Sequence, residues 1–528
     1  MENLISPKGY YISSMNISFW DVDNMRPIDM MVTDLNAEYL GVPRLSLMEN
    51  AGKAIAQEIS KLTDRGHITI FAGTGGNGGD GFVAARHLLN MGFEVEVILL
   101  AHPSRIKSKE AKRNWEVLEK MKISPAPLKV RIISDSSQLK ALDSTVIVDA
   151  ILGTGIRGKL REPIRSAIKI INDSKALKVA VDIPSGVAPE TGEIEDIAVE
   201  ADYTVTFHKI KDGLRMADPT FTGEIIVSDI GIPSICEIFT GPGDLLRLPQ
   251  RKGSSHKGEN GKILIIGGSA EYAGAPALAG LAAFKAGADL VTIACPESAM
   301  IPIKSYSPDL IVKGLPGDHI NPKMLNKITE MLKGVDCILI GCGGGLEPET
   351  GDAFNLIVRE IMGMEKPIVI DADGLKLIKK DTIKDYPNII LTPHEGEFRK
   401  FFSLKSPIIF EDFKEKVTAY HSISNNINGV VLLKGPIDMI FHREKMRLNN
   451  TGTPAMTVGG TGDCLAGITA SLWAQGLSAM DAAALAAFIN GRAGEIAEKK
   501  QGYGFTASEM IDFIPEAMSI PSTSSDIT

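Results

Sequence analysis

The sequence has few cysteines, and that scarcity excludes several classes of protein. Only 5 of its 528 residues are Cys. An odd number scattered over a long chain does not form a disulfide framework. Cys337 and Cys342 lie close in sequence, but no second pair completes a zinc site. We therefore expect buried, reduced thiols and a cytoplasmic protein.

The sequence also lacks long hydrophobic runs and an excess of positive charge. Residues 1–22 contain no apolar core that would make a signal peptide, and we expect a loose leader there. The longest apolar-rich stretch, Cys464–Met480, contains several polar residues and favours a buried helix over a membrane span. The chain has 56 Lys and Arg against 65 Asp and Glu, a net charge of −9. We therefore expect neither a membrane nor a nucleic acid as partner.

Glycine, in contrast, is abundant, with 52 residues. It separates strand-like apolar runs, such as HITIFAG (67–73) and STVIVDAILG (144–153), from helical patterns, such as that over Ile28–Ile59. Alternating strands and helices predict an α/β fold with parallel sheets covered on both faces. The polar, Gly- and Pro-rich stretch 240–261 is the best candidate for a linker. We predict two α/β domains, 23–240 and 243–515, and a tail at 516–528.

In an open α/β sheet, ligands bind beyond the carboxyl ends of the strands. The first such loop, Gly73–Gly81 (GTGGNGGDG), holds six glycines in nine residues, more than a tight turn needs. It favours a site for a phosphate or a dinucleotide. A second loop, Gly153–Lys159, and a third, with Asp182 and Ser185, should converge on the same edge. Their oxygen ligands suit a hard cation.

The motifs GTGGNGGDG, VDAILGTG and VDIPSG, preceded by LMENAGKA (47–54), resemble the YjeF N-terminal family of NAD(P)H-hydrate epimerases. The resemblance covers about 25–235 and implies a Rossmann-like three-layer domain that interconverts the R and S forms of hydrated NAD(P)H. It implies a potassium ion bound by Asn77, Asp149 and Ser185. Asp182 is the candidate acid/base, because epimerisation at C6 requires a proton to be moved. The implied hydrate site comprises Gly76, Asn77, Gly78, Gly79, Asp80, Gly153, Thr154, Gly155, Ile156, Arg157, Gly158, Lys159 and Asp182. The family usually has NNGGDG, and Gly76 replaces its first Asn.

In the second half, TVGGTGDCLAG (Thr457–Gly467) leads from a Gly-rich turn into a helix. Its N–H groups and helix dipole suit the charge on a transferred phosphoryl group. Asp463 could accept the proton of an attacking hydroxyl, although Asp is also common at helix starts. Lys434, at a strand end in LLKGP, is a candidate for a nucleotide phosphate contact or a plain salt bridge. The pattern resembles the ribokinase-like superfamily, in which this Asp is the catalytic base.

Six motifs in order resemble the YjeF C-terminal family of ADP- or ATP-dependent NAD(P)H-hydrate dehydratases: 256–291, IGCGGG, IDADGL, LTPHEGEF, LLKGP and GGTGD. The resemblance covers about 250–510. It implies that the hydroxyl of the S hydrate is phosphorylated and that phosphate then leaves. The implied hydrate side comprises Ala275, Gly343, His394, Glu395, Gly396, Glu397 and Asp463. The implied nucleotide side comprises Lys434, Gly435, Pro436, Ile437, Asp438, Thr453, Pro454, Ala455, Met456, Thr457, Val458, Gly459, Gly460, Thr461 and Gly462.

Two features of this half leave alternatives open. Asp371 and Asp373 resemble the family's acidic pair, which either holds Mg²⁺ through water or braces the loop. The usual GPGLG is GCGGG here, with Cys342 in place of Pro and Gly344 in place of Leu.

Together the halves predict a bifunctional enzyme of nicotinamide nucleotide repair, an isomerase and a lyase. Its expected substrates are NADHX and NADPHX, with ADP or ATP as co-substrate, and the family suggests a homo-oligomer. The alternative is a ribokinase-like vitamin or small-molecule kinase fused to a nucleotide-binding module. A partner-binding module without turnover is a further alternative for the N-terminal half. A dehydrogenase is disfavoured, because the Gly loop lacks the spacing and the ribose-binding acid of that class. The sequence does not choose between ADP and ATP, although the family's microbial members suggest ADP.

Overall fold

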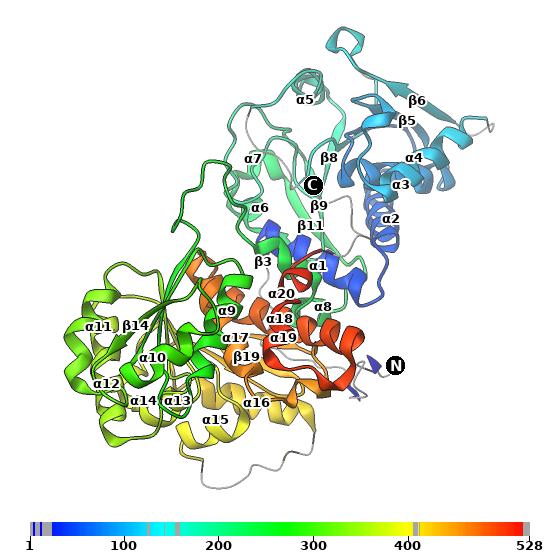
Figure 1. The fold of residues 1–528 in the computed structure, drawn as a ribbon. Helices are drawn as coiled ribbons and strands as arrows, with labels where there is room; N and C mark the ends of the chain where they lie inside the picture. The colour runs from blue at the N-terminus through cyan, green and yellow to red at the C-terminus, as the bar shows by residue number, and fades with distance from the viewer. Residues whose placement is uncertain are drawn as a thin grey trace. The chain divides into compact units, whose positions relative to one another are not determined.

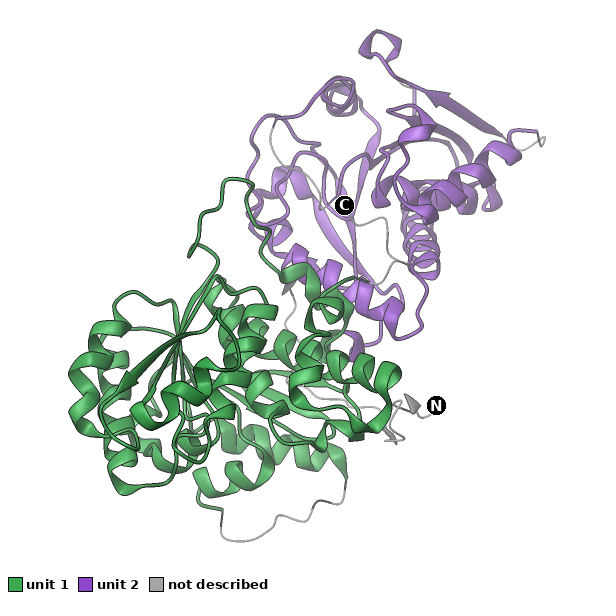
Figure 2. Cartoon of the chain, in the orientation of Figure 1, with its two compact units in different colours: residues 1–20, 237–520 green, residues 21–236, 521–528 purple. Residues whose placement is uncertain are grey.

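The computed structural model describes residues 24–520 except 124–126, 142, 154–158, 405–409 and 411, together with the short antiparallel strands β1 (Leu4–Ile5) and β2 (Tyr11–Ile12). The chain divides into two compact units between Cys236 and Glu237 (Figure 2). We call residues 21–236 the N-terminal unit and residues 237–520 the C-terminal unit. Within the described residues, no helix is both long enough and apolar enough to cross a membrane.

The N-terminal unit is built on a parallel sheet of seven strands in the order β11-β9-β8-β7-β4-β5-β6. The strands are β4 (His67–Ala72), β5 (Glu94–Leu99), β6 (Leu128–Ile132), β7 (Val146–Ala150), β8 (Leu177–Val181), β9 (Tyr203–Phe207) and β11 (Glu224–Ser228). A short parallel pair, β3 (Asn24–Met25) and β10 (Ile210–Lys211), lies outside this sheet. The central strands are buried along nearly their whole length, as expected of strands covered on both faces.

Helices cover both faces of this sheet. They are α1 (Pro27–Tyr39), α2 (Arg44–Leu62), α3 (Gly76–Asn90), α4 (Lys109–Met121), α5 (Ile164–Asp173), α6 (Asp212–Met216), α7 (Pro219–Thr222) and α8 (Ile235–Ile238). Ile70 of β4 belongs to a core cluster with α2, α3 and α4, whereas the next residue, Phe71, packs with α5 on the opposite face. This alternation follows from the two-residue period of a strand.

The C-terminal unit contains nine strands in the order β14-β13-β12-β15-β16-β17-β18-β19-β20, parallel up to β18 and antiparallel from β18 to β20. They are β12 (Lys262–Ile266), β13 (Leu290–Pro296), β14 (Ile311–Leu315), β15 (Cys337–Ile340), β16 (Ile368–Ile370), β17 (Ile389–Leu391), β18 (Val430–Leu433), β19 (Asp438–His442) and β20 (Lys445–Asn449). The unit is an α/β domain with one large, mostly parallel sheet.

The helices of this unit are α9 (Gly274–Lys285), α10 (Glu297–Lys304), α11 (Leu325–Leu332), α12 (Pro348–Gly363), α13 (Asp373–Leu377), α14 (Lys380–Ile383), α15 (Glu395–Phe401), α16 (Phe413–Ser424), α17 (Thr461–Ala474), α18 (Ala479–Gln501), α19 (Ala507–Ile511) and α20 (Ile514–Ala517). Helices α9, α17 and α18 pack together and share a large core with Ile263 and Ile265 of β12 (Figure 1). Gly467 permits the close approach of α17 and α9, because a Cβ there would lie 2.0 Å from the carbonyl oxygen of Ala279.

Two of the stated sequence-based expectations differ from the structure. The helical pattern over Ile28–Ile59 is two helices, because Gly41, with a φ of +93°, and Pro43 interrupt it. The stretch 240–261, predicted as a linker, begins as packed structure. There Asp244 is buried and accepts a hydrogen bond from the buried Arg447 on β20 at 2.8 Å.

Candidate functional sites

In each sheet, the order of the strands reverses between two neighbours: β4 and β7 in the N-terminal unit, and β12 and β15 in the C-terminal unit. At such a point the loops at the carboxyl ends of the two strands diverge and leave a crevice, which is the general ligand site of open α/β sheets. The predicted site residues of the N-terminal unit, and Ala275 and Gly343 of the C-terminal unit, lie at or after the ends of these strands or of a neighbouring strand.

Asn77 joins three loops of the N-terminal unit. Its side-chain amide donates to the carbonyl oxygens of Leu152, after β7, at 3.0 Å and of Val181, at the end of β8, at 2.7 Å. Close packing makes two glycines necessary here. A Cβ on Gly78 would lie 2.1 Å from the carbonyl oxygen of Gly73, and one on Gly153 would lie 2.4 Å from the Asn77 Oδ1.

Asp149 and Ser185 form a buried pair beside this junction. The Ser185 hydroxyl donates to one carboxylate oxygen of Asp149 at 2.6 Å, and the Ser185 N–H donates to the other at 2.7 Å. Burial raises the pKa of Asp149 to about 6, against the lowering effect of these hydrogen bonds. No Lys or Arg of the described residues forms an ion pair with Asp149. A buried carboxylate next to amide and hydroxyl oxygens is a donor set that fits a potassium ion.

Asp182 follows β8 with a φ of +65°, an unusual conformation for a residue other than glycine. Its Oδ1 accepts hydrogen bonds from the hydroxyl of Thr206, at 3.1 Å, and from the ammonium group of Lys211. Only 1% of Lys211 and 8% of Asp182 is exposed. Lys211 was not among the residues predicted from sequence, since nothing in the pattern FHKIKDG marks one lysine as buried.

Two further carboxylates, Asp34 on α1 and Asp80 on α3, lie within electrostatic range of this pair. Burial raises the pKa of Asp34 to about 6, with Asp182 adding to the increase and Arg44 and Lys211 opposing it. Burial also raises the pKa of Asp80 well above its usual value, and the charges of Asp182 and Asp34 raise it further. The N-terminal site thus combines a carboxylate bonded to a lysine with two carboxyl groups whose pKa values are raised.

The other predicted residues of this site fall into three groups: residues of α3, an exposed lysine, and residues that the structure does not describe. Gly76, Asn77, Gly78, Gly79 and Asp80 form the first turns of α3. Lys159 is exposed. Thr154, Gly155, Ile156, Arg157 and Gly158 lie outside the described residues.

In the C-terminal unit, a cavity of about 810 Å³ lies at the carboxyl ends of β12, β15 and β16. Its lining includes three residues of the predicted hydrate side, Ala275, Gly343 and Asp463, and also Asp373. It further includes Ser269, Ala270, Glu271, Tyr272, Asp318, His319, Gly345, Leu346, Glu347, Ala372 and Lys376. None of these was predicted individually as a site residue, although Ser269–Tyr272, Gly345 and Ala372 lie in the motifs quoted above. The structure therefore brings residues from five separate segments to one wall.

Asp463 lies in the first turn of α17, which begins after Gly460 in the left-handed conformation. Burial raises the pKa of Asp463 to about 6, the negative charge of Asp371 raises it further, and a hydrogen bond with the Cys342 thiol opposes the increase. One ligand-capable atom of each of Cys342, Asp371 and Asp463 lies within 4.8 Å of the others. Burial raises the pKa of the Cys342 thiol well above its usual value, so the thiol keeps its proton and can donate it to the carboxylate.

Lys434, at the end of β18, donates to the Oδ1 of the buried Asp371 at 2.8 Å, and the Thr392 hydroxyl donates to the same oxygen at 2.8 Å. Burial alone would lower the pKa of Lys434, but the charges of Asp371 and Glu397 more than offset it and raise the pKa. Asp373 accepts hydrogen bonds from the Lys376 ammonium at 2.9 Å and the Gly345 N–H at 3.1 Å. Each of the two carboxylates thus already binds a lysine, and Asp373 also braces the GCGGG loop.

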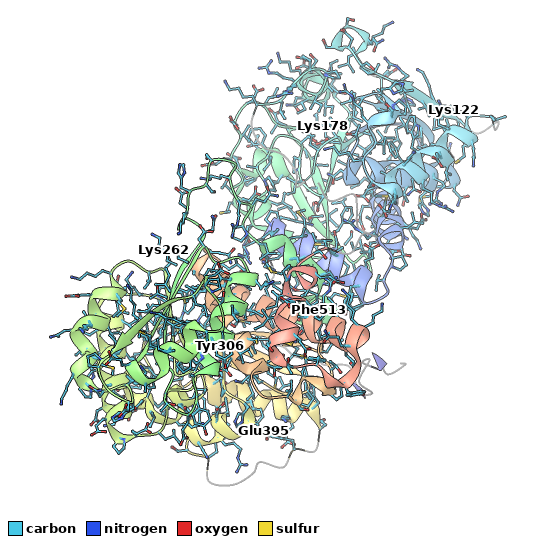
Figure 3. All side chains as sticks on the ribbon, in the orientation of Figure 1. Lys122, Lys178, Lys262, Tyr306, Glu395 and Phe513 are labelled. Atoms are coloured by element: carbon cyan, nitrogen blue, oxygen red, sulfur yellow. The ribbon has the colours of Figure 1, made fainter. Side chains whose placement is uncertain are left out.

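His394 caps helix α15. Its Nδ1 accepts the N–H groups of Gly396, at 3.0 Å, and of Glu397, at 3.3 Å, while the Glu397 side chain accepts the N–H of His394. Glu395, labelled in Figure 3 at the start of this helix, lines a second cavity of about 320 Å³ with the segment Lys434–Ile437. The four residues His394–Glu397 therefore have a structural role, and their contact with a hydrate stays a prediction.

Hydrogen bonds fix the position of several other predicted nucleotide-side residues. Asp438 accepts the N–H of Gly435 at 3.0 Å and the side-chain amide of Asn449 at 2.9 Å. The Thr461 hydroxyl donates to the carbonyl oxygen of Met456 at 2.9 Å and closes the loop before α17. A Cβ on Gly462 would lie 3.4 Å from the Lys434 Nζ, which places the Gly-rich turn beside this lysine.

Comparison with known proteins agrees with this division. Residues 44–213 match the family described as YjeF-related protein N-terminus, and residues 263–516 match the NAD(P)H-hydrate dehydratase family. The bifunctional NAD(P)H-hydrate repair enzyme Nnr of Methanothermobacter thermautotrophicus is 60% identical over 494 residues, 94% of this chain and 95% of that protein. The chain belongs to the bifunctional NAD(P)H-hydrate repair enzymes. A second member, from Hyperthermus butylicus, is 43% identical over 94% of this chain and 92% of its own length.

Solved structures similar to part of this repair enzyme cover about half of its chain. The ADP/ATP-dependent NAD(P)H-hydrate dehydratase from Bacillus subtilis, co-crystallised with ATP and Mg²⁺, covers 53% of this chain and 97% of its own, with 24% identity and a TM-score of 0.44. A ribokinase-like superfamily protein from Enterococcus faecalis covers 53% of this chain and 95% of its own, with 24% identity and a TM-score of 0.47.

Proposed function

We propose that this chain repairs hydrated nicotinamide nucleotides, with the two steps divided between its two units. It is an NAD(P)H-hydrate epimerase and an ADP/ATP-dependent NAD(P)H-hydrate dehydratase. We assign the epimerase to the N-terminal unit and the dehydratase to the C-terminal unit. The observation that carries the assignment is the position of Asp463 on the wall of the 810 Å³ cavity, beside Ala275 and Gly343 and at the start of α17.

In the dehydratase, Asp463 is the base for the hydroxyl at C6 of the S hydrate. Its raised pKa makes it a better proton acceptor than an exposed carboxylate. The hydroxyl oxygen gives its proton to Asp463 and attacks the terminal phosphoryl group of ADP or ATP, and AMP or ADP leaves. The N–H groups at the start of α17 stabilise the charge that develops. Phosphate then leaves C6, a proton leaves C5, and the ring regains its double bond. We assign to Lys434 the role of neutralising the charge of the nucleotide phosphates.

A magnesium ion would supply positive charge to the phosphates of the nucleotide. Asp371 and Asp373 are already paired with Lys434 and Lys376, so they fit an ion held through water better than one bound directly. Asp373 is the better candidate of the two, because it lines the cavity.

In the epimerase, Asp182 is the base and Asp80 the acid. Asp182 takes the proton of the C6 hydroxyl while the C6–N1 bond opens to an aldehyde, and the protonated Asp80 delivers a proton to N1. Closure on the other face of the aldehyde returns both protons and gives the other epimer. Two carboxyl groups whose environments separate their protonation states suit this exchange. Potassium bound by Asn77, Asp149 and Ser185 would brace the three loops that line the site.

The test follows absorbance at 340 nm as the purified protein, with Mg²⁺ and K⁺, meets mixed epimers of NADHX with ADP or with ATP. We expect a fast phase from the S form and a slower phase from the R form, both faster than spontaneous exchange. Asp182→Asn is expected to abolish the enzymatic slow phase and to leave the fast phase intact. A protein that returns no NADH with either nucleotide would point instead to a vitamin-type kinase.

The predictions of a homo-oligomer and of a cytoplasmic protein stay predictions. Light scattering coupled to size-exclusion chromatography measures the first of them directly.

A further inference from the structure

Lys211 is among the most completely buried charged side chains in the described part of the chain, with 1% of its surface exposed. It was not part of the predicted site, and the epimerase chemistry described above does not require it to touch substrate. A buried ammonium group is costly unless its donors are satisfied. Its position therefore needs a physical explanation.

Lys211 has three polar contacts, one for each N–H of its ammonium group. It donates to the Oδ1 of Asp182, to the hydroxyl of Thr206 at 3.1 Å and to the carbonyl oxygen of Phe207 at 3.0 Å. The backbone is held as well, because β10 pairs with β3 in parallel register, Lys211 opposite Met25. The ammonium group is therefore fixed at the end of β9 with no donor left for a substrate.

The two donors to Asp182 converge on the same oxygen. Thr206 and Lys211 both bond to Oδ1, and no hydrogen bond from the described residues ends on Oδ2. A carboxylate held by one oxygen keeps a fixed orientation and presents the other oxygen for proton transfer. The left-handed backbone of Asp182 makes this orientation costly without such support.

The carboxyl groups around Asp182 explain why a cation is needed at this position. Asp34 from α1 and Asp80 from α3 face the same group, while Arg44 and His208 act on Asp34 from the edge of the cluster. Three carboxyl groups close together do not all ionise without a cation between them, because like charges favour the neutral form. Lys211 bonds to only one of the three, and that one is Asp182.

We propose that Lys211, together with Thr206, is the positioning residue of the epimerase, which holds Asp182 by its Oδ1 and directs its Oδ2 at the substrate. The lysine selects which of the three carboxyl groups is the base and leaves the proton on Asp80. This inference rests on the proposed function, because it assumes that Asp182 is the base of the epimerase.

The experiment uses the full chain with mixed NADHX epimers and ADP, since the dehydratase phase of the same protein serves as an internal control. In Lys211→Met we expect the slow phase to fall at least about tenfold, towards the spontaneous rate, with KM for the R form within twofold of the parent. We expect the acid limb of its kcat/KM profile to move up by about one pH unit or more. The matched control is Lys178→Met, at the amino end of β8 and labelled in Figure 3, which should change neither value.

Two milder variants test the same inference in case Lys211→Met does not fold. Thr206→Val removes one of the two donors to Oδ1 and should move the acid limb in the same direction by a smaller amount. Lys211→Arg keeps the charge, so the acid limb should return to the position of the parent even if kcat stays low.

The outcomes separate the inference from the proposed function. If the parent protein consumes the R form no faster than spontaneous exchange, the epimerase assignment fails. If the parent is active and Lys211→Met keeps a slow phase within twofold of it, or loses activity through KM with the acid limb unmoved, then Lys211 has only a structural role and the inference is wrong.

Discussion

Lys211 in the N-terminal unit and Lys434 in the C-terminal unit each donate a hydrogen bond to a buried aspartate at the end of a parallel strand. The two pairs differ in what they do to the candidate proton-transfer group. Lys211 bonds to Asp182 itself. Lys434 bonds to Asp371, and the charge of that neighbour helps to raise the pKa of Asp463 to about 6. The charge of Lys434 itself opposes that increase. The lysine therefore bonds to the candidate base directly in one site and to a neighbour of the candidate base in the other.

The largest effect should come from Asp463→Asn, because it removes the base from only one of the two sites. We expect the dehydratase rate to fall by about 10²- to 10⁴-fold, with the conversion of R to S form unchanged when the epimers are separated by chromatography. Dehydratase activity within tenfold of the parent would contradict the role of Asp463 and break the comparison.

The same variant has a second expected effect, on stability. The pKa of Asp463 is raised on folding from 3.8 to about 6, so its contribution to stability is present below pH 3.8 and lost as the pH rises through about 6. Asn carries no charge, and Asp463→Asn should therefore raise the melting temperature of the C-terminal unit at pH 7. Differential scanning calorimetry at pH 7 and pH 4 measures the difference, which should shrink at pH 4.

Next in size is Lys434→Met, which leaves the buried Asp371 without its cation. Breaking a buried ion pair by removing one partner typically costs about 3 kcal/mol or more. We expect a loss of stability of this order in the C-terminal unit by urea unfolding, together with weaker binding of ADP. The matched control is Lys376→Met, whose partner Asp373 also accepts a backbone N–H and whose loss should cost less. Equal losses in the two variants would show that burial of the lysine does not distinguish the pairs.

The pH dependence of kcat/KM provides a further comparison of the two sites. Because the base must be ionised, kcat/KM of the dehydratase should fall tenfold for each pH unit below about 6. The Cys342 thiol stabilises the ionised form, so Cys342→Ala should move this limb up by about half a pH unit. The epimerase limb, measured in the same protein, should not respond to Cys342→Ala, and a shared response would indicate that the two limbs report the same group.

The smallest effect is expected at the start of α3. A side chain at Gly76 would have open space around it, with no neighbouring atom within 4 Å of its Cβ, whereas a Cβ on Gly78 would lie 2.1 Å from a carbonyl oxygen. Gly76→Asn, which restores the residue usual in the family, should therefore change the melting temperature by less than about 2 °C and alter KM of the epimerase a few-fold. Gly78→Ala should destabilise the N-terminal unit clearly. A destabilised Gly76→Asn would contradict the open position.

The sequence predicted the α/β class and the strand-end loops because each central strand is a short apolar run that ends in Gly, Asp or His. It did not predict β6 (LKVRI), an edge strand whose charged residues interrupt the apolar run. It also missed the antiparallel hairpin of β19 and β20, where the buried Arg447 is satisfied by the carbonyl oxygens of Ile238 and Phe239 and by Asp244. A buried arginine of this kind has no signature in a hydrophobic pattern.

The sequence alone was enough to predict Asp463, Asp182 and the glycine loops as parts of candidate sites, because proton transfer and close backbone approach favour these residue types next to one another along the chain. The tertiary structure alone decided the partners of these residues. Lys211 lies 29 positions from Asp182, and Lys434 lies 63 positions from Asp371. Parallel strands place residues far apart in sequence at one sheet edge, and the burial and charge they meet there set their protonation states.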